Sequence, residues 1–403
     1  MRSTTKPTKP AKPTTPAFRP SVPDEGDFTS WLRSPAVTAR VGLWLGICFG
    51  LAFVTGLISH WGQTPAPWLP FPTSPSWGYR VTQGLHVTAG TAAVPLLLVK
   101  LWTVFPKLVA RPPRAVRALA LHGLERGSIA VLVAAAVFQL ATGLANAAQW
   151  YPWHFDFRPT HYALGWVATG ALVVHIAVKL PIIRAALTSD VDSTVQDRPG
   201  MERGPGVMSR RGLLRTTWLA TGVAVLATAG SAVPLLRKVS VLGVRSGTGP
   251  QGVPINHTAA YRGVVAAATG AAYQLTVVRG DRRLALTLAD LKAMPQTTAS
   301  LPIACVEGWS AGATWTGVPV RALLDRVGAP AGSEVLVESL QTHGGERAST
   351  LAGNFSDHPH TLLALELDGS PLSLDHGFPC RLIAPDRPGV LQTKWVGRLE
   401  VTS

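Results

Sequence analysis

Five apolar stretches, each close to the length of a membrane span, are the feature that most constrains this chain. They lie at about 41–59, 81–105, 127–147, 162–180 and 217–236. A helix needs about 20 apolar residues to cross the hydrocarbon core of a bilayer. Because only 15% of the residues are charged and 47% are hydrophobic, we expect a fold built on five transmembrane helices.

Lys and Arg are unevenly distributed between the loops that join these stretches. Residues 1–40 contain seven, residues 106–126 five and residues 179–215 seven, whereas residues 60–80 and 148–160 contain one each. Since positively charged loops stay in the cytoplasm, we expect a multi-pass protein of the plasma membrane. Its N-terminus is then cytoplasmic and its C-terminal domain extracytoplasmic. The net charge of +15 reflects this topology, and no basic, aromatic-rich stripe predicts nucleic-acid binding.

The composition divides the chain into a disordered cytoplasmic tail rich in Thr, Pro and Lys, a four-span domain, a cytoplasmic loop, a fifth span, a linker and a C-terminal domain. The expected bounds are 1–40, 41–180, 181–215, 216–236, 237–250 and 251–403. In the last segment, strands are predicted at 273–280, 282–287, 333–340, 379–385 and 395–401 and short helices at 288–294 and 319–328. The predicted fold is multi-domain: an all-α transmembrane bundle of five spans followed by an α+β, mostly β, domain.

Cys305 ends an apolar run in the segment LPIACVEGWSAGATWTGVP. Gly and Trp after it predict a turn, and a helix is expected near the second Trp. A buried cysteine is usually a packing residue, but a thiolate at a strand end is also a nucleophile or a soft metal ligand. The three cysteines, Cys48, Cys305 and Cys380, are too far apart to predict a disulfide framework or a zinc motif. The residues alone leave packing, nucleophilic catalysis and metal binding open.

This segment resembles the molybdopterin-binding domain of the sulfite oxidase family, in which a cysteine followed by VEGWS and WTGVP surrounds molybdenum. The segment LDHGFPCRLIAPDRPGVLQTKWVGRLEV and, more loosely, GVPINHTAAYRG are also similar to that family. The resemblance implies that Cys305 ligates molybdenum. It further implies that the pterin and its phosphate are held by Asn256, His257, His376, Arg381, Gln392, Thr393 and Lys394. We expect the domain to resemble the bacterial periplasmic members that reduce sulfoxides, which lack the immunoglobulin-like domain of eukaryotic sulfite oxidases.

Paired arginines, Arg210 and Arg211, precede the fifth apolar stretch in the segment SRRGLL. Such a pair before an apolar run is typical of a twin-arginine export signal, although it also fits the positive-inside rule. The implied cofactor is inserted in the cytoplasm, so the domain has to cross the membrane folded. We therefore expect the twin-arginine export machinery to be a partner.

Histidines within the apolar stretches are candidate haem ligands, because ionisable residues inside spans are costly and usually functional. A lone histidine, in contrast, often only forms a hydrogen bond. His161 and His175 are separated by a spacing that puts them about 21 Å apart on nearly one face of a helix. This pattern resembles the membrane cytochrome b subunits of formate dehydrogenases, and it implies one or two b-type haems.

An outer haem is expected between His86 and His161, with His60 as a competing ligand. An inner haem would use His175, with His122 as its partner. Because Lys100 stands where the second span would offer another ligand, a single outer haem is the alternative.

These features predict a membrane-anchored, molybdenum-dependent oxidoreductase that transfers an oxygen atom to or from a small oxyanion or sulfoxide. It would exchange electrons with the membrane quinone pool through haem. The sequence leaves open a sulfite dehydrogenase and a quinol-driven reductase of sulfoxides or N-oxides. The alternatives are a membrane electron carrier or interaction protein whose exported domain has lost the cofactor, and an exported cysteine hydrolase.

Overall fold

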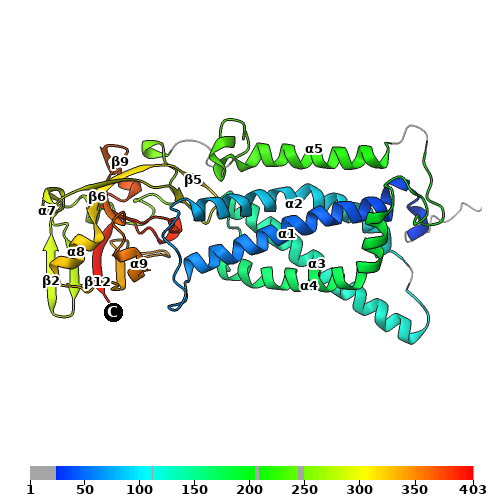
Figure 1. Cartoon of the computed structure of the whole chain (residues 1–403), viewed down its shortest axis with the longest axis horizontal. Helices are drawn as coiled ribbons and strands as arrows, with labels where there is room; N and C mark the ends of the chain where they lie inside the picture. Colours follow the sequence, from blue (N-terminus) through cyan, green and yellow to red (C-terminus); the bar gives the residue numbers. More distant parts are fainter. Residues whose placement is uncertain (1–23, 111, 205–207, 244–248, 403) are drawn as a thin grey trace, which may run out of the picture.

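The computed structural model describes residues 24–402 except 111, 205–207 and 244–248. The molecule is elongated, with a helical half and a β-rich half placed end to end (Figure 1). Its long helices are α1 (Pro35–Gln63), α2 (Gly78–Leu108), α3 (Val116–Ala147), α4 (Phe157–Thr188) and α5 (Arg210–Thr228). All five are long and apolar enough to cross a membrane, which confirms the expected five apolar helices.

Helix α1 begins inside the segment that we expected to be a disordered tail. Ser34 caps it by accepting a hydrogen bond from the Val37 N–H, and Pro35 occupies the first turn, where its missing N–H costs nothing. The preceding turn is also ordered, since Trp31 and Leu32 are buried. The predicted boundary at residue 40 was therefore too late.

Helices α4 and α5 also differ from their predicted bounds. Helix α4 continues through Pro181 to Thr188, beyond the predicted end at residue 180. Prolines are tolerated in such helices because neighbouring groups satisfy the freed carbonyl. Helix α5 begins at Arg210, capped by the Ser209 hydroxyl, and ends before the predicted residue 236.

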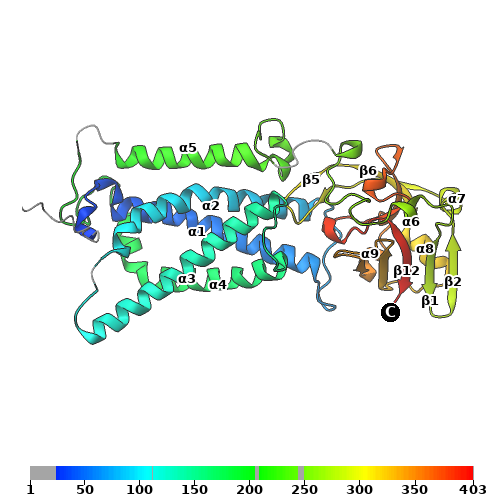
Figure 2. The ribbon, with the colours of Figure 1, turned by 180° about the vertical axis from the view of Figure 1, so that it is seen from behind.

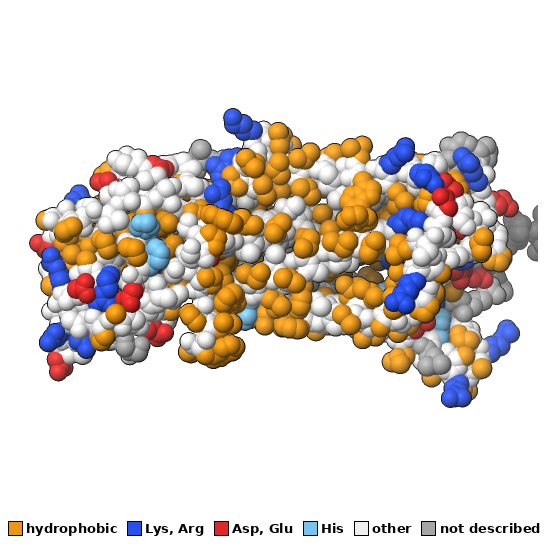
Figure 3. All heavy atoms as spheres, in the orientation of Figure 1, with side chains coloured by type: hydrophobic (Ala, Val, Ile, Leu, Met, Phe, Trp, Pro, Cys, Tyr) orange, Lys and Arg blue, Asp and Glu red, His pale blue; other side chains and the backbone are white. Residues whose placement is uncertain are grey.

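The helices form a bundle in which α1 packs along α2 and α4, and α3 packs along α4 and α2. Helix α5 lies along α2 at the edge of the bundle (Figures 1 and 2). Hydrophobic side chains cover the visible face of the bundle, and Lys and Arg gather at the end far from the β-rich half (Figure 3). This distribution is the one that a membrane-spanning bundle needs.

In the β-rich half, the residues that the structure describes form twelve strands and four short α-helices. The strands are β1 (Leu275–Arg279), β2 (Arg282–Leu286), β3 (Thr297–Ser300), β4 (Ile303–Ala304), β5 (Ser310–Ala311), β6 (Thr314–Pro319), β7 (Val335–Ser339), β8 (Ala348–Leu351), β9 (Leu362–Leu367), β10 (Ser370–Pro371), β11 (Arg381–Ile383) and β12 (Val396–Val401). The helices are α6 (Val265–Thr269), α7 (Leu288–Ala293), α8 (Val320–Arg326) and α9 (Gly353–Ser356). Each predicted strand and helix has its counterpart here.

Two sheets and one hairpin organise these strands. One sheet has the order β2-β1-β12-β7-β8, with β1 and β12 parallel, and the other has the order β10-β9-β6-β3 with β11 beside β9. The strands β4 and β5 form a separate hairpin. The large apolar core lies between the sheets and α8, where Leu323 and Leu324 are fully buried. The hairpin lies at the side of the domain that faces the helical bundle (Figure 1).

Side chains of both halves bond across the junction. Asn354 donates to the Phe71 carbonyl over 2.8 Å, and Arg237 donates to the Ser310 carbonyl over 3.0 Å. Asp386 accepts a hydrogen bond from the Tyr79 N–H at the start of α2. The β-rich half is therefore attached to the bundle at several separate points.

Candidate functional site

Cys305 lies in the turn of the β4–β5 hairpin and is 3% exposed. Its N–H donates to the Trp309 carbonyl over 2.9 Å, and the Gly308 N–H donates to the Cys305 carbonyl over 3.0 Å. Gly308 has a φ of +83°, which a residue with a side chain rarely adopts. The predicted turn is therefore present. The helix expected near the second Trp is α8, which begins at Val320, while Trp315 itself lies in β6.

A pocket surrounds the Cys305 sulfur, and all the residues that the family resemblance pointed to line it. They are Asn256, His257, His376, Arg381, Gln392, Thr393 and Lys394. Sequence reasoning missed Arg262 and Trp309, which line the same pocket. Both lie within the segments that carry the family resemblance, Trp309 in VEGWS and Arg262 in GVPINHTAAYRG, but no role was assigned to either residue.

Positive charge is concentrated in this pocket. Arg381 is buried, donates to the carbonyls of His376 and Gln392 over 3.1 and 3.3 Å, and has no partner for its Nε among the described residues. Lys394 donates from Nζ to the carbonyls of His257 and Asp375 over 2.7 and 3.0 Å. These donors meet only neutral carbonyls, so the charge itself is not neutralised by them.

The pKa values follow from this burial. Loss of water lowers the pKa of Arg381 to about 9. It lowers the pKa of Lys394 to about 7, with the Arg381 charge adding to the effect. His376 is affected in the same way, since burial and then Arg381 lower its pKa to about 4. A bound anion would reverse these shifts.

The residues present fit a molybdopterin. The Cys305 thiol is a soft ligand of the kind that such a metal accepts. The unpartnered Arg381 Nε and the unpartnered Gln392 Oε1 are buried polar atoms that await a ligand. The chain's other cysteine in this domain differs, because burial raises the pKa of Cys380 to about 12 and its sulfur lies 3.0 Å from the Tyr273 hydroxyl.

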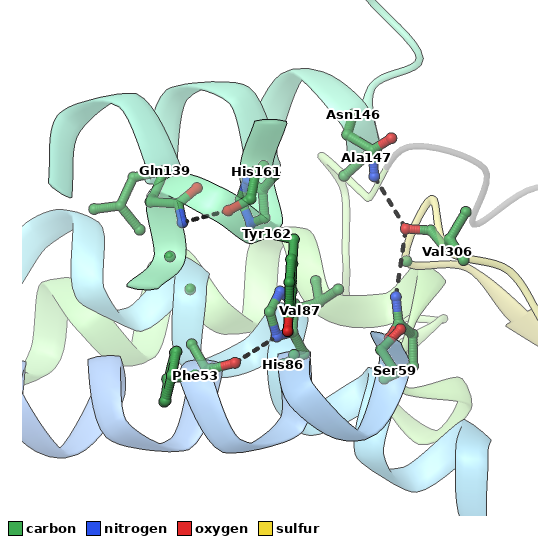
Figure 4. A pocket seen from close by; sticks show the side chains of 18 of the residues that line it. Phe53, Ser59, His86, Val87, Gln139, Asn146, Ala147, His161, Tyr162 and Val306 are labelled. Carbon is green, nitrogen blue, oxygen red and sulfur yellow. Dashed lines mark hydrogen bonds between the residues drawn. The ribbon is translucent and has the colours of Figure 1, made fainter. Parts of the chain in front are cut away.

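A second cavity, of about 630 Å³, lies within the helical bundle beneath the hairpin. It falls within the range of about 300–1,000 Å³ that is usual for ligand and cofactor pockets. His60, His86 and His161 line it, together with residues 306–308 of the hairpin turn. Figure 4 shows His86 and His161 on one side and Val306 on the other.

The imidazoles of His86 (α2) and His161 (α4) lie edge to face, with ring centroids 6.3 Å apart. An imidazole nitrogen lies about 2 Å from a metal that it binds, so two rings this close can both reach one metal atom. The Nδ1 of His86 donates to the Ala52 carbonyl over 2.8 Å, and the Nδ1 of His161 lies 3.3 Å from the Thr142 hydroxyl. Such bonds fix the ring and leave Nε2 for a metal.

The other candidate histidines are placed less favourably. His60 lines the cavity, but its ring stacks on Tyr162 at 3.7 Å and its Nε2 lies 3.3 Å from the Thr64 hydroxyl. No hydrogen bond or ring contact joins His175 to His122 in the part of the chain that the structure describes. The structure thus brings one of the two expected pairs of haem ligands together.

Arg210 and Arg211 lie at the start of α5 in very different surroundings. Arg210 is fully buried, where it donates to the carbonyls of Trp31 and Ser193 and pairs with Asp197. Arg211 is exposed and pairs with Asp190 and Asp192. The loop before α5 therefore folds around the first arginine.

The β-rich half is similar to known proteins. Residues 262–403 match the family model described as "Oxidoreductase molybdopterin binding domain". The "Putative protein-methionine-sulfoxide reductase subunit YedZ1" of Azospira oryzae is 34% identical over 119 residues, 30% of this chain and 44% of that protein. The mitochondrial sulfite oxidase of Drosophila melanogaster is 29% identical over 154 residues, 32% of this chain and 27% of that protein.

The NADH nitrate reductase of Solanum lycopersicum is 34% identical over 112 residues, 24% of this chain and 12% of that protein. The alignments thus span less than half the length of each of these relatives. The expectation of a molybdopterin-binding oxidoreductase domain is therefore supported by the match of residues 262–403 and by the similarity to sulfite oxidases.

Proposed function

We propose that this chain is a membrane-anchored molybdenum oxidoreductase that reduces a small sulfoxide outside the cytoplasm. Its electrons would come from quinol through one b-type haem. One observation carries the proposal: the turn that holds Cys305 forms part of the wall of the cavity that holds His86 and His161. The two candidate cofactor sites thus share the turn of the β4–β5 hairpin.

In the pocket around Cys305, the thiolate would hold the metal, and the cationic side chains would hold the anionic part of the pterin. Bound molybdopterin supplies oxygen-atom transfer coupled to a two-electron change. Arg381 and Lys394 orient the cofactor through charge-assisted hydrogen bonds. Burial of Arg381 keeps water from competing for its guanidinium.

In the cavity within the helical bundle, His86 and His161 would both bind a haem iron. Their Nδ1 hydrogen bonds support this role, since they fix both rings. We propose one haem rather than two. Lys100, on α2, donates from Nζ to the Thr38 carbonyl over 3.0 Å and lies against Gly42, so it occupies space on the side of the bundle where a second haem would bind.

The choice of a sulfoxide rests on the redox balance and on similarity. Reduction of a sulfoxide consumes two electrons and two protons and releases a sulfide and water, and oxidation of a quinol supplies both. The similarity to the methionine-sulfoxide reductase subunit points the same way.

Sulfite oxidation is the second candidate, and the similarity to sulfite oxidases supports it. Sulfite and water would then yield sulfate, two protons and two electrons, which would leave through the haem to quinone.

We propose that the N-terminus is cytoplasmic and that the β-rich half faces the outside of the plasma membrane. Arg210 and Arg211 would act as a twin-arginine signal before the preceding loop folds around Arg210. The exposure of Arg211 and the distribution of Lys and Arg support this topology.

The test is metal analysis of the purified full-length chain. We expect about one molybdenum and one iron atom per chain, one for each site. Cys305→Ser should lose molybdenum and keep iron, whereas His161→Ala should lose iron and keep molybdenum. Methionine sulfoxide should then reoxidise the reduced haem. Haem reduction by sulfite instead would favour the second candidate, and absence of molybdenum from folded protein would refute the proposal.

A further inference from the structure

The residue that follows Cys305 lies in the wall of the membrane cavity. Val306, Glu307 and Gly308 line that cavity together with His86 and His161 (Figure 4). The approach is close, since a Cβ at Gly308 would lie only 2.8 Å from the Val87 side chain on α2. The hairpin turn therefore contacts the bundle directly, without an intervening element.

The Val306 carbonyl accepts hydrogen bonds from two helices at once. Asn146, on α3, donates from Nδ2 over 3.0 Å (Figure 4). Gln83, on α2, donates from Nε2 over 3.3 Å. Both amide side chains are buried. The Tyr151 hydroxyl donates to the Asn146 Oδ1 over 2.9 Å, which fixes that amide in the donating orientation. Two buried amides thus hold one carbonyl.

Each of these amides lies about one helical turn from a residue of the histidine site. For Gln83 this residue is His86, and for Asn146 it is Thr142, which contacts His161. Gln83 precedes His86 by three residues on α2, so both lie on the same face. Asn146 follows Thr142 by four residues on α3, and the Thr142 hydroxyl lies 3.3 Å from the His161 Nδ1. Gln83 therefore ties the Val306 carbonyl to the helix of His86, and Asn146 ties it to the helix whose Thr142 contacts His161.

We propose that electrons pass between the two cofactors within one chain, through the peptide of Val306, and that Gln83 and Asn146 are the positioning residues for this transfer. The inference rests on the proposed function, because it needs molybdenum on Cys305 and haem between His86 and His161. For each substrate reduced, two electrons travel this path one at a time. Quinol supplies them to the haem, and the substrate receives them from molybdenum.

The test is flash reduction of the haem in the full-length, cofactor-loaded protein. A pulse of photoreduced deazaflavin delivers one electron, and haem absorbance then reports its transfer to molybdenum. A rate independent of protein concentration identifies transfer within one chain. The measurement needs no substrate, so it does not depend on the direction of turnover.

The variant is the double substitution Gln83→Leu with Asn146→Leu. Its matched control is Asn354→Leu, which removes an amide-to-carbonyl hydrogen bond at another point of the junction. We expect the transfer rate to fall several-fold in the double variant, because the Val306 carbonyl loses both of its side-chain donors, and to stay near the parent rate in the control. The haem spectrum and the molybdenum(V) resonance should be the same in all three proteins.

A parent-like rate in the double variant would overturn the route, and so would an equal loss in the control. Metal contents are measured before the flash. A parent chain without molybdenum or haem would refute the proposed function, and the route with it, whereas a fully loaded parent with an unaffected double variant refutes the route alone.

Discussion

Arg381 is the residue whose surroundings most clearly favour binding of an anionic group. Its guanidinium is buried and its Nε has no hydrogen-bond partner among the described residues. A hydrogen bond to a charged group contributes about 1.5–3 kcal/mol. The molybdopterin content of Arg381→Met should therefore be lower than that of the parent by a factor of about ten or more. Arg381→Lys should retain an intermediate amount, since lysine keeps the charge but lacks the planar fork. Molybdenum content per chain measures both.

Arg398→Met is the matched control, because Arg398 lies on the surface of β12 and pairs with Glu338 and Glu400. Exposed ion pairs contribute little to stability, so this variant should keep its molybdenum. If Arg381→Met also kept parent levels, the pocket would not bind the cofactor in the proposed way.

Sequence reasoning reached some of these residues and not others, for a physical reason. Cys305 and Arg381 belong to a contiguous pattern that resembles a known family. Gln83 and Asn146 are amides within apolar helices. In sequence, an amide that bonds another part of the fold cannot be distinguished from one that bonds its own helix. Only the three-dimensional placement of the Val306 carbonyl distinguishes them.

At the scale of the helices, each of the four that surround the membrane cavity contributes a glycine to its wall. These are Gly56 (α1), Gly90 (α2), Gly143 (α3) and Gly165 (α4). A Cβ at Gly90 would meet nothing within 4 Å, so Gly90→Leu should fill the cavity without a clash. Since leucine is also the better helix former, by roughly 1 kcal/mol, we expect folded protein that has lost its haem. Haem absorbance per chain measures the loss.

Gly46→Leu is the control for this variant, because Gly46 lies on α1 outside the cavity and a Cβ there also meets nothing within 4 Å. It should bind haem as the parent does. A Gly90→Leu protein with full haem content would mean that the haem binds elsewhere.

The lengths of the elements show where prediction from sequence stops. Apolar composition marks the part of a helix that lies in lipid, but α1 and α4 continue beyond it into polar residues. Strands β3, β6, β8 and β9 were not predicted. Trp315 and its neighbours in β6, for example, pair with β3 and β9 on both sides, and such long-range pairing leaves little trace in a local pattern.

At the scale of the whole molecule, Asp386 joins the β-rich half to the start of α2. Burial raises the pKa of its carboxyl to about 6, even though the backbone N–H groups of Tyr79 and Gly78 donate to it. Separation of the two halves would return the carboxyl to water and to its usual pKa of about 3.9. The joined form therefore binds a proton that the separated form releases, and the junction should strengthen as the pH falls from about 7 towards 4.

This pH dependence can be measured by hydrogen exchange at the start of α2 in nanodisc-embedded protein between pH 7.5 and 5. In the parent, protection should increase as the pH falls. In Asp386→Asn it should be constant, because the amide oxygen still accepts from the Tyr79 N–H but does not titrate. Asp368→Asn is the control, since Asp368 accepts from the Thr314 N–H within the β-rich half. If Asp386→Asn kept the parent's pH dependence, another group would control the junction, and Asp386 would serve only as a hydrogen-bond acceptor.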